Sequence, residues 1–247
     1  FMIKVMDNWM ILLVVILAAM VHASFHLSIS VLTLLSGHTL SRKKSQLQLT
    51  KLSMSLVLGS ICSTILIFST FAHFGGIFYN FVFSKVVWAV LVGILVSAGV
   101  ATWIFYYRRG KNIRNGTELW VPRPLAKYLN NRASKTKHSA EAFALGVISV
   151  LSELLFYFAP LVVSALFASR VSPAFQFAIL VIYVLISNLP IFSIACIISG
   201  GHPISEIQVW RNKNKRFLQF VSGLGMIVLA FIVGAVIFTP EILGVSL

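Results

Sequence analysis

Six long runs of apolar residues divide the chain, and shorter polar stretches separate them. The runs cover residues 9–37, 52–74, 86–107, 140–169, 174–199 and 217–238. About 20 predominantly apolar residues are enough to cross the hydrocarbon core of a bilayer as an α-helix, and every run meets that length. The pattern predicts an all-α, polytopic membrane protein with six transmembrane helices.

The composition supports lipid as the surrounding solvent. Of the 247 residues, 58% are hydrophobic and 11% are charged, and the mean hydropathy is +0.93. A soluble domain averages about 45–50% apolar and about 25% charged residues, so this chain has too few charges to cover a water-exposed surface. The net charge of +14 would suggest nucleic acid in a soluble protein. In a membrane protein it is explained by basic cytoplasmic loops, and we expect no nucleic-acid partner.

The basic residues gather in alternate connections. All but three of the 20 Lys and Arg residues follow the first, third and fifth apolar runs. The exceptions are Lys4, Lys85 and Arg170. Because basic loops stay in the cytoplasm, the odd-numbered loops are predicted to be cytoplasmic and both ends of the chain to lie outside. We expect a multi-pass protein of a plasma membrane, such as a bacterial inner membrane.

The long basic connection divides the chain into two halves with three predicted helices each. The first half covers 1–107, the basic cytoplasmic loop 108–139 and the second half 140–247. An odd number of helices per half makes the second half enter the membrane from the opposite side. The first run of each half is near 30 residues long and carries polar residues around its middle. These features predict a 3+3 inverted repeat, a plan in which transporters place the substrate site between the repeats.

Three ionisable side chains lie deep inside the predicted spans. His22 and His26 are in the first run, and Glu153 is in the fourth; among the six acidic residues, Glu153 alone is in mid-span. An Asp, Lys or Arg at the centre of a membrane helix costs about 2.5–3.5 kcal/mol on insertion scales, so such groups usually mark functional sites. These three residues are therefore the main candidates for a site.

The spacing of the polar residues predicts how they meet. His22, His26 and Ser30 recur every four residues and share one helix face, and Glu153 and Tyr157 share a face by the same rule. If the two leading helices cross, two imidazoles and one carboxylate converge in the middle of the membrane. We expect these five residues to bind the substrate.

The fifth run contributes another polar position, Asn188, two residues before Pro190. Proline leaves a backbone carbonyl without its helical donor, and interrupted helices of this kind line many transporter cavities. Asn188 is therefore a further candidate for substrate binding. An ordinary proline kink explains the same pattern.

The chemistry of the predicted site is compatible with several roles. His22, His26 and Glu153 could bind a divalent metal ion, as a substrate or as a ligand, because imidazole and carboxylate groups both coordinate such ions. They suit a proton-coupled carrier equally, since imidazole changes its charge near neutral pH. They could also simply form hydrogen bonds between helices. No other cofactor is expected.

Two stretches of the sequence carry a resemblance: residues 23–37 with the basic residues at 42–44, and residues 142–146 leading into Glu153 and Pro160. The first stretch is similar to the first helix and basic turn, and the second resembles the start of the second repeat, of the LysE/CcdA-type superfamily of small six-helix transporters and redox conduits. The Pro-Gly-Pro sequence of its amino-acid exporters is absent, and so are the paired cysteines of its redox members. The resemblance implies a transporter or a redox conduit with six membrane helices.

Three functions remain open from the sequence. The first is secondary transport of a small solute or metal cation by alternating access. The second is a non-transporting subunit or scaffold whose basic loops dock a partner or anionic lipid. The third is a redox conduit or a metal-dependent membrane enzyme. We do not expect an enzyme, because phosphate-binding loops, dinucleotide-binding turns and nucleophile elbows are all missing. Membrane lipid and the transported species are the expected partners, and the sequence leaves a homodimer open.

Small residues in helical register predict where helices pack closely. Gly59 and Ser63 form one such pair, and Gly93 and Ser97 form another. Small side chains let two helix backbones approach each other within a membrane. We therefore expect each pair to face a neighbouring helix.

Overall fold

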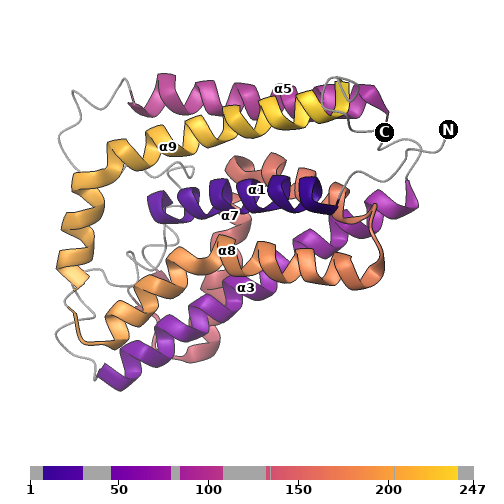
Figure 1. Ribbon diagram of the computed structural model, residues 1–247. Coiled ribbons are helices and arrows are strands. Elements are labelled where there is room, and N and C mark those ends of the chain that lie inside the picture. Colours follow the sequence, from indigo (N-terminus) through magenta and orange to yellow (C-terminus); the bar gives the residue numbers. More distant parts are fainter. Residues whose placement is uncertain are drawn as a thin grey trace.

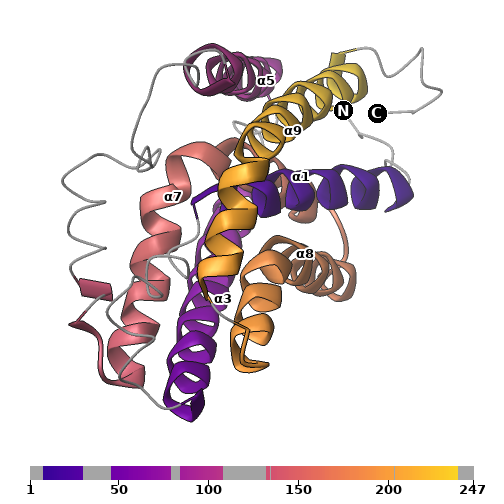
Figure 2. The same cartoon turned by 90° about the vertical axis from the view of Figure 1, so that its left-hand side faces the viewer.

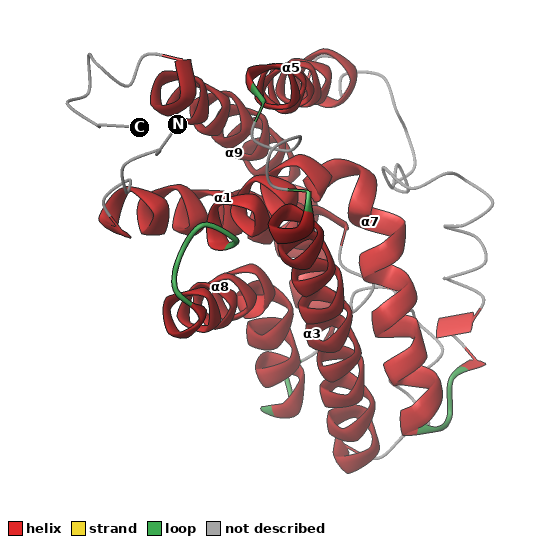
Figure 3. Cartoon of the chain, turned by 90° about the vertical axis from the view of Figure 1, so that its right-hand side faces the viewer, coloured by secondary structure: helices red, strands yellow, loops and turns green. Residues whose placement is uncertain are grey.

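The computed structural model describes residues 8–29, 46–78, 84–107, 132–133, 135–202 and 204–238, and within these ranges it contains helices and no strand (Figure 3). The helices are α1 (Asn8–Ile29), α3 (Gln46–Ile77), α5 (Lys85–Ala101), the π-helix η1 (Thr102–Tyr107), α7 (Ser139–Ala168), α8 (Pro173–Ser199) and α9 (Ile204–Phe238). The predicted all-α class is confirmed for this part of the chain. Residues 30–37 of the first predicted helix and 108–131 of the predicted basic loop lie outside the described residues.

Five of the described helices are long and apolar enough to cross a membrane. Their candidate spans are Asn8–His26, Gln46–Ile77, Lys85–Ile104, Pro173–Ser199 and Arg216–Phe238. The remaining long helix, α7, is divided into two arms, Ser139–Leu154 and Phe156–Ala168, which meet at 91°. The described helices therefore agree with six membrane passages when the two arms of α7 are counted as one broken span.

The bend in α7 differs from the continuous helix predicted over 140–169. Pro160 lies in the second arm and has no N–H to donate to the carbonyl of Phe156, so the helix is weakest just after the first arm ends. The second arm is almost entirely buried, and Leu161, Val163 and Ala165 have no exposed surface. Packing against neighbouring helices therefore stabilises its turned direction.

Two helices begin earlier than their apolar runs. Helix α9 begins at Ile204 rather than at 217, and α3 begins at Gln46 rather than at 52. The added turns contain charged or polar residues such as Arg211 and Gln48. Arg and Gln have a high helix propensity, but a search for apolar runs does not include them. The membrane-crossing part of α9, Arg216–Phe238, agrees with the prediction.

Helix α1 is central in the bundle. It packs against α7, α8 and α9, while α3 packs against α7 and α8, and α5 packs against α9 (Figures 1 and 2). In every pair of helices with extensive contacts, one helix therefore comes from the first half of the chain and the other from the second half. The two halves are interleaved rather than side by side.

Close backbone contact between α3 and α7 depends on glycine. A Cβ atom at Gly59 would collide with the carbonyl oxygen of Phe143, and one at Gly146 would collide with that of Leu56. The prediction that Gly59 faces a neighbouring helix is confirmed. The prediction for Gly93 is wrong, because a Cβ atom there would meet nothing within 4 Å among the described residues. Helix α5 instead approaches α9 through Gly99, on another face.

The exterior of the bundle is apolar, whereas polar side chains are buried inside it. Trp9 and Phe231 are 79% and 77% exposed, and many other large apolar side chains share the outer surface. Buried polar residues include His22, His26 and Glu153. This distribution is the reverse of the one in water-soluble proteins and is typical of a protein surrounded by lipid.

Candidate functional site

A histidine and a glutamate from the two halves of the chain meet where α1 crosses α7. Nδ1 of His26 lies 3.0 Å from Oε2 of Glu153, and the two side chains are 0% and 1% exposed. The surrounding core is formed by apolar residues such as Phe25 and Val150. The predicted meeting of an imidazole and a carboxylate from the two halves is thus present.

His22 extends this pair toward α8. Its ring stacks on that of His26, with 4.6 Å between centroids, and on that of Tyr157, with 3.6 Å. Its Nδ1 lies 3.0 Å from the hydroxyl oxygen of Tyr183, and the tautomer of the ring decides which of the two atoms donates. Contacts between polar side chains therefore run without a gap from Tyr183 on α8, through α1, to Glu153 on α7.

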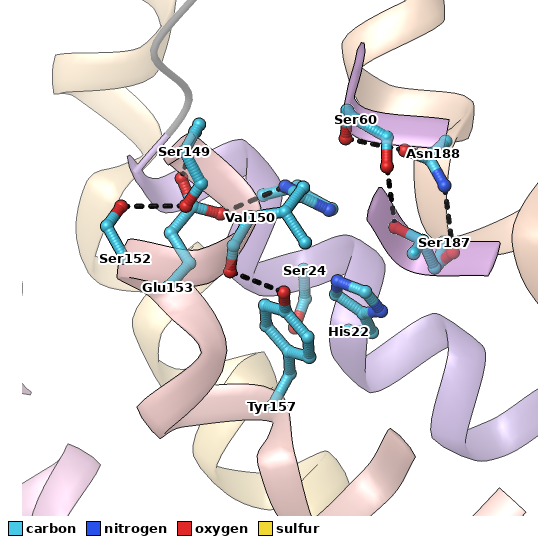
Figure 4. A network of polar contacts seen from close by, with 12 residues as sticks. His22, Ser24, Ser60, Ser149, Val150, Ser152, Glu153, Tyr157, Ser187 and Asn188 are labelled. Atoms are coloured by element: carbon cyan, nitrogen blue, oxygen red, sulfur yellow. Dashed lines mark hydrogen bonds and ion pairs between the residues drawn. The ribbon is translucent and has the colours of Figure 1, made fainter. Parts of the chain in front are cut away.

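The other oxygen of Glu153 is held by its own helix. Ser149 Oγ donates to Oε1 of Glu153 at 3.1 Å, and Ser152 Oγ donates to the carbonyl of Ser149 at 2.7 Å (Figure 4). Both carboxylate oxygens therefore have a polar neighbour, and the orientation of the carboxylate is fixed. A carboxylate buried without such neighbours would be strongly destabilising.

Tyr157 supports the site from the bend in α7. Its hydroxyl donates to the carbonyl oxygen of Val150 at 2.6 Å, across the junction between the two arms. A bent helix leaves carbonyls without helical donors, and such groups are costly away from water unless another donor reaches them. The hydroxyl of Tyr157 thus stabilises the bend, and the ring of Tyr157 supports His22 by stacking on it.

Three ring nitrogens of the cluster have no hydrogen bond among the described residues. They are Nε2 of His22 and both nitrogens of His26; Nδ1 of His26 has only its ion-pair contact with Oε2 of Glu153, and that oxygen lacks a hydrogen bond as well. Buried polar atoms usually have partners, so those that lack one deserve a functional explanation. Among the described residues, nothing competes with a bound solute for the two Nε2 atoms.

The remaining predicted site residues are not part of this cluster. Asn188 Oδ1 accepts a hydrogen bond from Ser60 at 2.8 Å, and its amide nitrogen donates to Val184 and Ser187 (Figure 4). All these partners belong to α3 and α8, so Asn188 stabilises the packing of those two helices. Ser30 lies outside the described residues, and its predicted role stays a prediction.

Sequence reasoning missed two residues of the cluster, Tyr183 and Ser149. Ser149 precedes Glu153 by four residues, so it shares a helix face with a residue that the sequence did single out. Extending that polar face by one turn would have found Ser149. The sequence alone does not indicate that Tyr183 faces His22, because that depends on how α8 is rotated against α1.

The geometry gives no support to a bound metal ion. Among the residues that the structure describes, no three His, Cys, Asp or Glu side chains are grouped so that they could hold one. His26 and Glu153 already contact each other directly. Cys62 on α3 and Cys196 on α8 are free and exposed.

A cavity approaches the cluster from the end of the bundle where α3 ends and α8 begins. It has a volume of about 400 Å³, and its lining includes Phe68, His73, Gln176 and Leu180. The ring of Phe68 also contacts that of Tyr183, with 5.1 Å between centroids. Contacts therefore lead from the cavity lining through Phe68 and Tyr183 to His22.

Comparison with known proteins identifies no relative: no family model, curated protein or solved structure matches the chain. The class of protein is therefore defined by its own structure. In the part of the chain that the structure describes it is all-helical, with five helices, or six with the bent α7, that are long and apolar enough to cross a membrane.

Proposed function

We propose that the protein is a secondary membrane transporter that works by alternating access, with His22, His26 and Glu153 at its central site. The observation that carries the proposal is the buried contact between His26 and Glu153 at the crossing of α1 and α7. Ionisable groups are retained inside membrane helices mainly where they bind or move ions and solutes. Here they also join the two halves of the chain, which must move relative to each other in such a transporter.

The packing of the helices supports an inverted repeat. If α1, α3 and α5 correspond to α7, α8 and α9, exchanging the halves converts the α1–α8 contact into the α7–α3 contact. The α1–α7, α3–α8 and α5–α9 contacts convert into themselves. These pairings are the ones that a twofold axis between the repeats would produce. The α1–α9 contact departs from that symmetry, because its counterpart between α5 and α7 is much smaller. The site lies on the α1–α7 contact, where such an axis would pass.

The broken helix α7 provides further support. Many transporters build their binding sites from discontinuous helices, whose interrupted backbone is tolerated only inside the protein. The two arms of α7 meet between Glu153 and Tyr157, so the break lies within the candidate site. The resemblance to the LysE/CcdA-type superfamily supports transport by a small six-helix protein as well.

Protons are the coupling ion that the contacts favour. His26 and Glu153 contact each other directly, and His22 and Tyr183 continue the line of polar contacts to α8. Proton relays within membranes are typically built from Glu, Asp and His. A divalent cation would instead require the carboxylate and both imidazoles to converge on one point. The cavity near Phe68 would give the transported species access to this cluster from the outside of the membrane in the predicted orientation.

Replacement of Glu153 by Gln tests the proposal. The melting temperature of the purified protein is first measured over a range of pH and with added divalent cations or amino acids. A ligand that binds only the folded state raises the melting temperature by mass action. Uptake of each positive ligand is then measured in proteoliposomes. We expect Glu153→Gln to abolish uptake while the protein remains folded and inserted, because Gln keeps the shape of the side chain but cannot release a proton.

Glu141→Gln is the matched control. Glu141 belongs to the same helix but is exposed at its start, so this variant should transport at the wild-type rate. Wild-type uptake by Glu153→Gln would exclude the proposed mechanism. Equal loss in both variants would mean that general damage to α7, and not the buried carboxylate, explains the effect.

A further inference from the structure

A second cavity lies at the start of α7, away from the histidine cluster. Its volume is about 350 Å³. Its lining is composed of two basic side chains, one hydroxyl, one carboxylate and an apolar wall: Arg132, Lys135, Thr136, Glu141, Ala144, Leu145 and Ile148. The basic groups come from the chain before α7, and the apolar wall comes from the first turns of that helix. The cavity thus combines positive charge at one side with an apolar surface at the other.

The basic side of this cavity has a defined local structure. Thr136 Oγ1 donates to the carbonyl of Arg132 at 2.9 Å, and its N–H donates to the carbonyl of Ala133 at 3.3 Å. Ala133 is fully buried in an apolar cluster that includes Leu145. The short segment that carries Arg132 and Lys135 is therefore anchored to the bundle.

Glu141 adds one negative charge to the lining. Its carboxylate accepts a hydrogen bond from the backbone N–H of Lys137 at 2.9 Å and so satisfies a donor just before α7 begins. With Arg132 and Lys135 in the same lining, the cavity keeps one net positive charge. Lys137 is exposed close by and adds to the positive potential at this end of the helix.

The cavity lies at the end of the bundle where the basic connections gather. Gln48 donates to the carbonyl of Lys137 at 3.4 Å, and Gln46 donates to the carbonyl of Ile198 near the end of α8. The start of α3, the start of α7 and the end of α8 are thus together. In the predicted orientation this end faces the cytoplasm, where anionic lipids attract basic groups.

We propose that this cavity binds an anionic phospholipid, with its phosphate between Arg132 and Lys135 and an acyl chain along α7. Guanidinium and ammonium groups bind phosphate oxygens through charge-assisted hydrogen bonds. Ala144, Leu145 and Ile148 continue from the basic groups into the membrane-crossing part of α7 and form an apolar surface for the chain. A soluble anion would use the basic groups but not this wall, whereas a phospholipid matches both. The proposal depends on membrane insertion and not on transport.

A lipid titration tests the site. The purified full-length protein is titrated with phosphatidylglycerol or phosphatidylcholine in mixed micelles, or with inorganic phosphate, and its melting temperature is recorded. We expect phosphatidylglycerol to raise the melting temperature and phosphatidylcholine to have little effect. In the double variant Arg132→Gln/Lys135→Gln the apparent affinity for phosphatidylglycerol should fall about 30-fold, as expected for two basic side chains acting on one anionic headgroup.

Two further variants separate this site from nonspecific attraction. Lys213→Gln/Arg216→Gln removes the same charge from α9, outside the cavity, and should retain the wild-type affinity within about twofold, as expected for surface charges that are screened by salt. Ala144→Trp fills the apolar wall without changing any charge and should also weaken phosphatidylglycerol binding. Equal losses in the two double variants would overturn the proposal. So would unchanged binding in Arg132→Gln/Lys135→Gln, or a shift with inorganic phosphate as large as with the lipid.

Discussion

At the scale of single residues, the contact between His26 and Glu153 is a compromise between solvation and attraction. Removing a carboxylate from water costs several kcal/mol, and a nearby imidazole and hydroxyl offset that cost only when their geometry is good. Glu153 has both neighbours, but only Ser149, at 3.1 Å, makes a hydrogen bond; Nδ1 of His26 lies 3.0 Å from Oε2 without hydrogen-bond geometry. Such a pair contributes little stability compared with apolar side chains of the same size. Its presence in the interior is therefore better explained by function than by stability.

Tyr183 provides a test of the cluster that does not require a known substrate. In Tyr183→Phe, Nδ1 of His22 loses its neighbour at 3.0 Å and becomes a buried polar atom without a partner. We expect the free energy of unfolding to fall by about 1 kcal/mol, between the average for hydrogen bonds in membrane proteins and the full cost of an unpaired group. Equilibrium unfolding in mixed micelles containing SDS measures this change.

Ser97→Ala is the control for that measurement. It also removes one hydroxyl, but Ser97 donates only to the carbonyl of Ile94 and is on the exposed side of α5. Its effect should remain below about 0.5 kcal/mol, as for most surface substitutions. An equally small effect of Tyr183→Phe would show that the contact with His22 is not formed.

At the scale of helices, the approach of α3 to α7 is set by glycine. The backbone of each helix occupies the space that a Cβ atom would need at Gly59 or Gly146. Side chains of any other type would force the helices apart and would also move Glu153, which is on α7. Helix α5 does not have this constraint at Gly93, where the space is open.

Two substitutions by alanine should therefore have opposite effects. Gly59→Ala places a Cβ atom against the Phe143 carbonyl and should lower the free energy of unfolding by at least about 2 kcal/mol, as overpacking does. Gly93→Ala meets no neighbour and should leave stability unchanged or raise it by up to about 1 kcal/mol, because alanine favours a helix more than glycine does. Thermal melting of the two purified variants compares them directly. Similar melting temperatures would contradict the close contact between α3 and α7.

At the scale of the whole molecule, the described helices form one interleaved bundle. Each half packs mainly against the other half, so neither half has a hydrophobic core of its own. The site, the break in α7 and the contact between α1 and α7 coincide. Movement of one half against the other would therefore change the surroundings of Glu153 first.

The predicted orientation of this bundle can be tested with cysteine labelling. Cys62 and Cys196 are first replaced by alanine, and single cysteines are introduced at the exposed positions Lys137 and Ser172, on opposite ends of α7. Intact cells are treated with a membrane-impermeant maleimide. We expect the cysteine in Ser172→Cys to react in intact cells, and the cysteine in Lys137→Cys to react only after the cells are permeabilised. The reverse result would invert the orientation derived from the basic loops.

The sequence by itself determined the class of the fold and the position of most helices. Hydropathy depends on each residue's own side chain, so the apolar runs are visible without any knowledge of neighbours. The same holds for the isolated position of Glu153, since an acidic residue in an apolar run is evident from the chain alone. Only charged extensions, such as the start of α9, were missed, because they are helical without being apolar.

Only the tertiary structure decided which faces meet and where a helix breaks. Gly59 and Gly93 have similar sequence surroundings, yet only Gly59 meets another backbone. Tyr183 became part of the cluster because α8 is rotated toward α1, and α7 bends because its second arm finds buried surface in a new direction. The physical reason is that helix rotation and crossing depend on contacts summed over several helices. A single stretch of sequence does not contain that information.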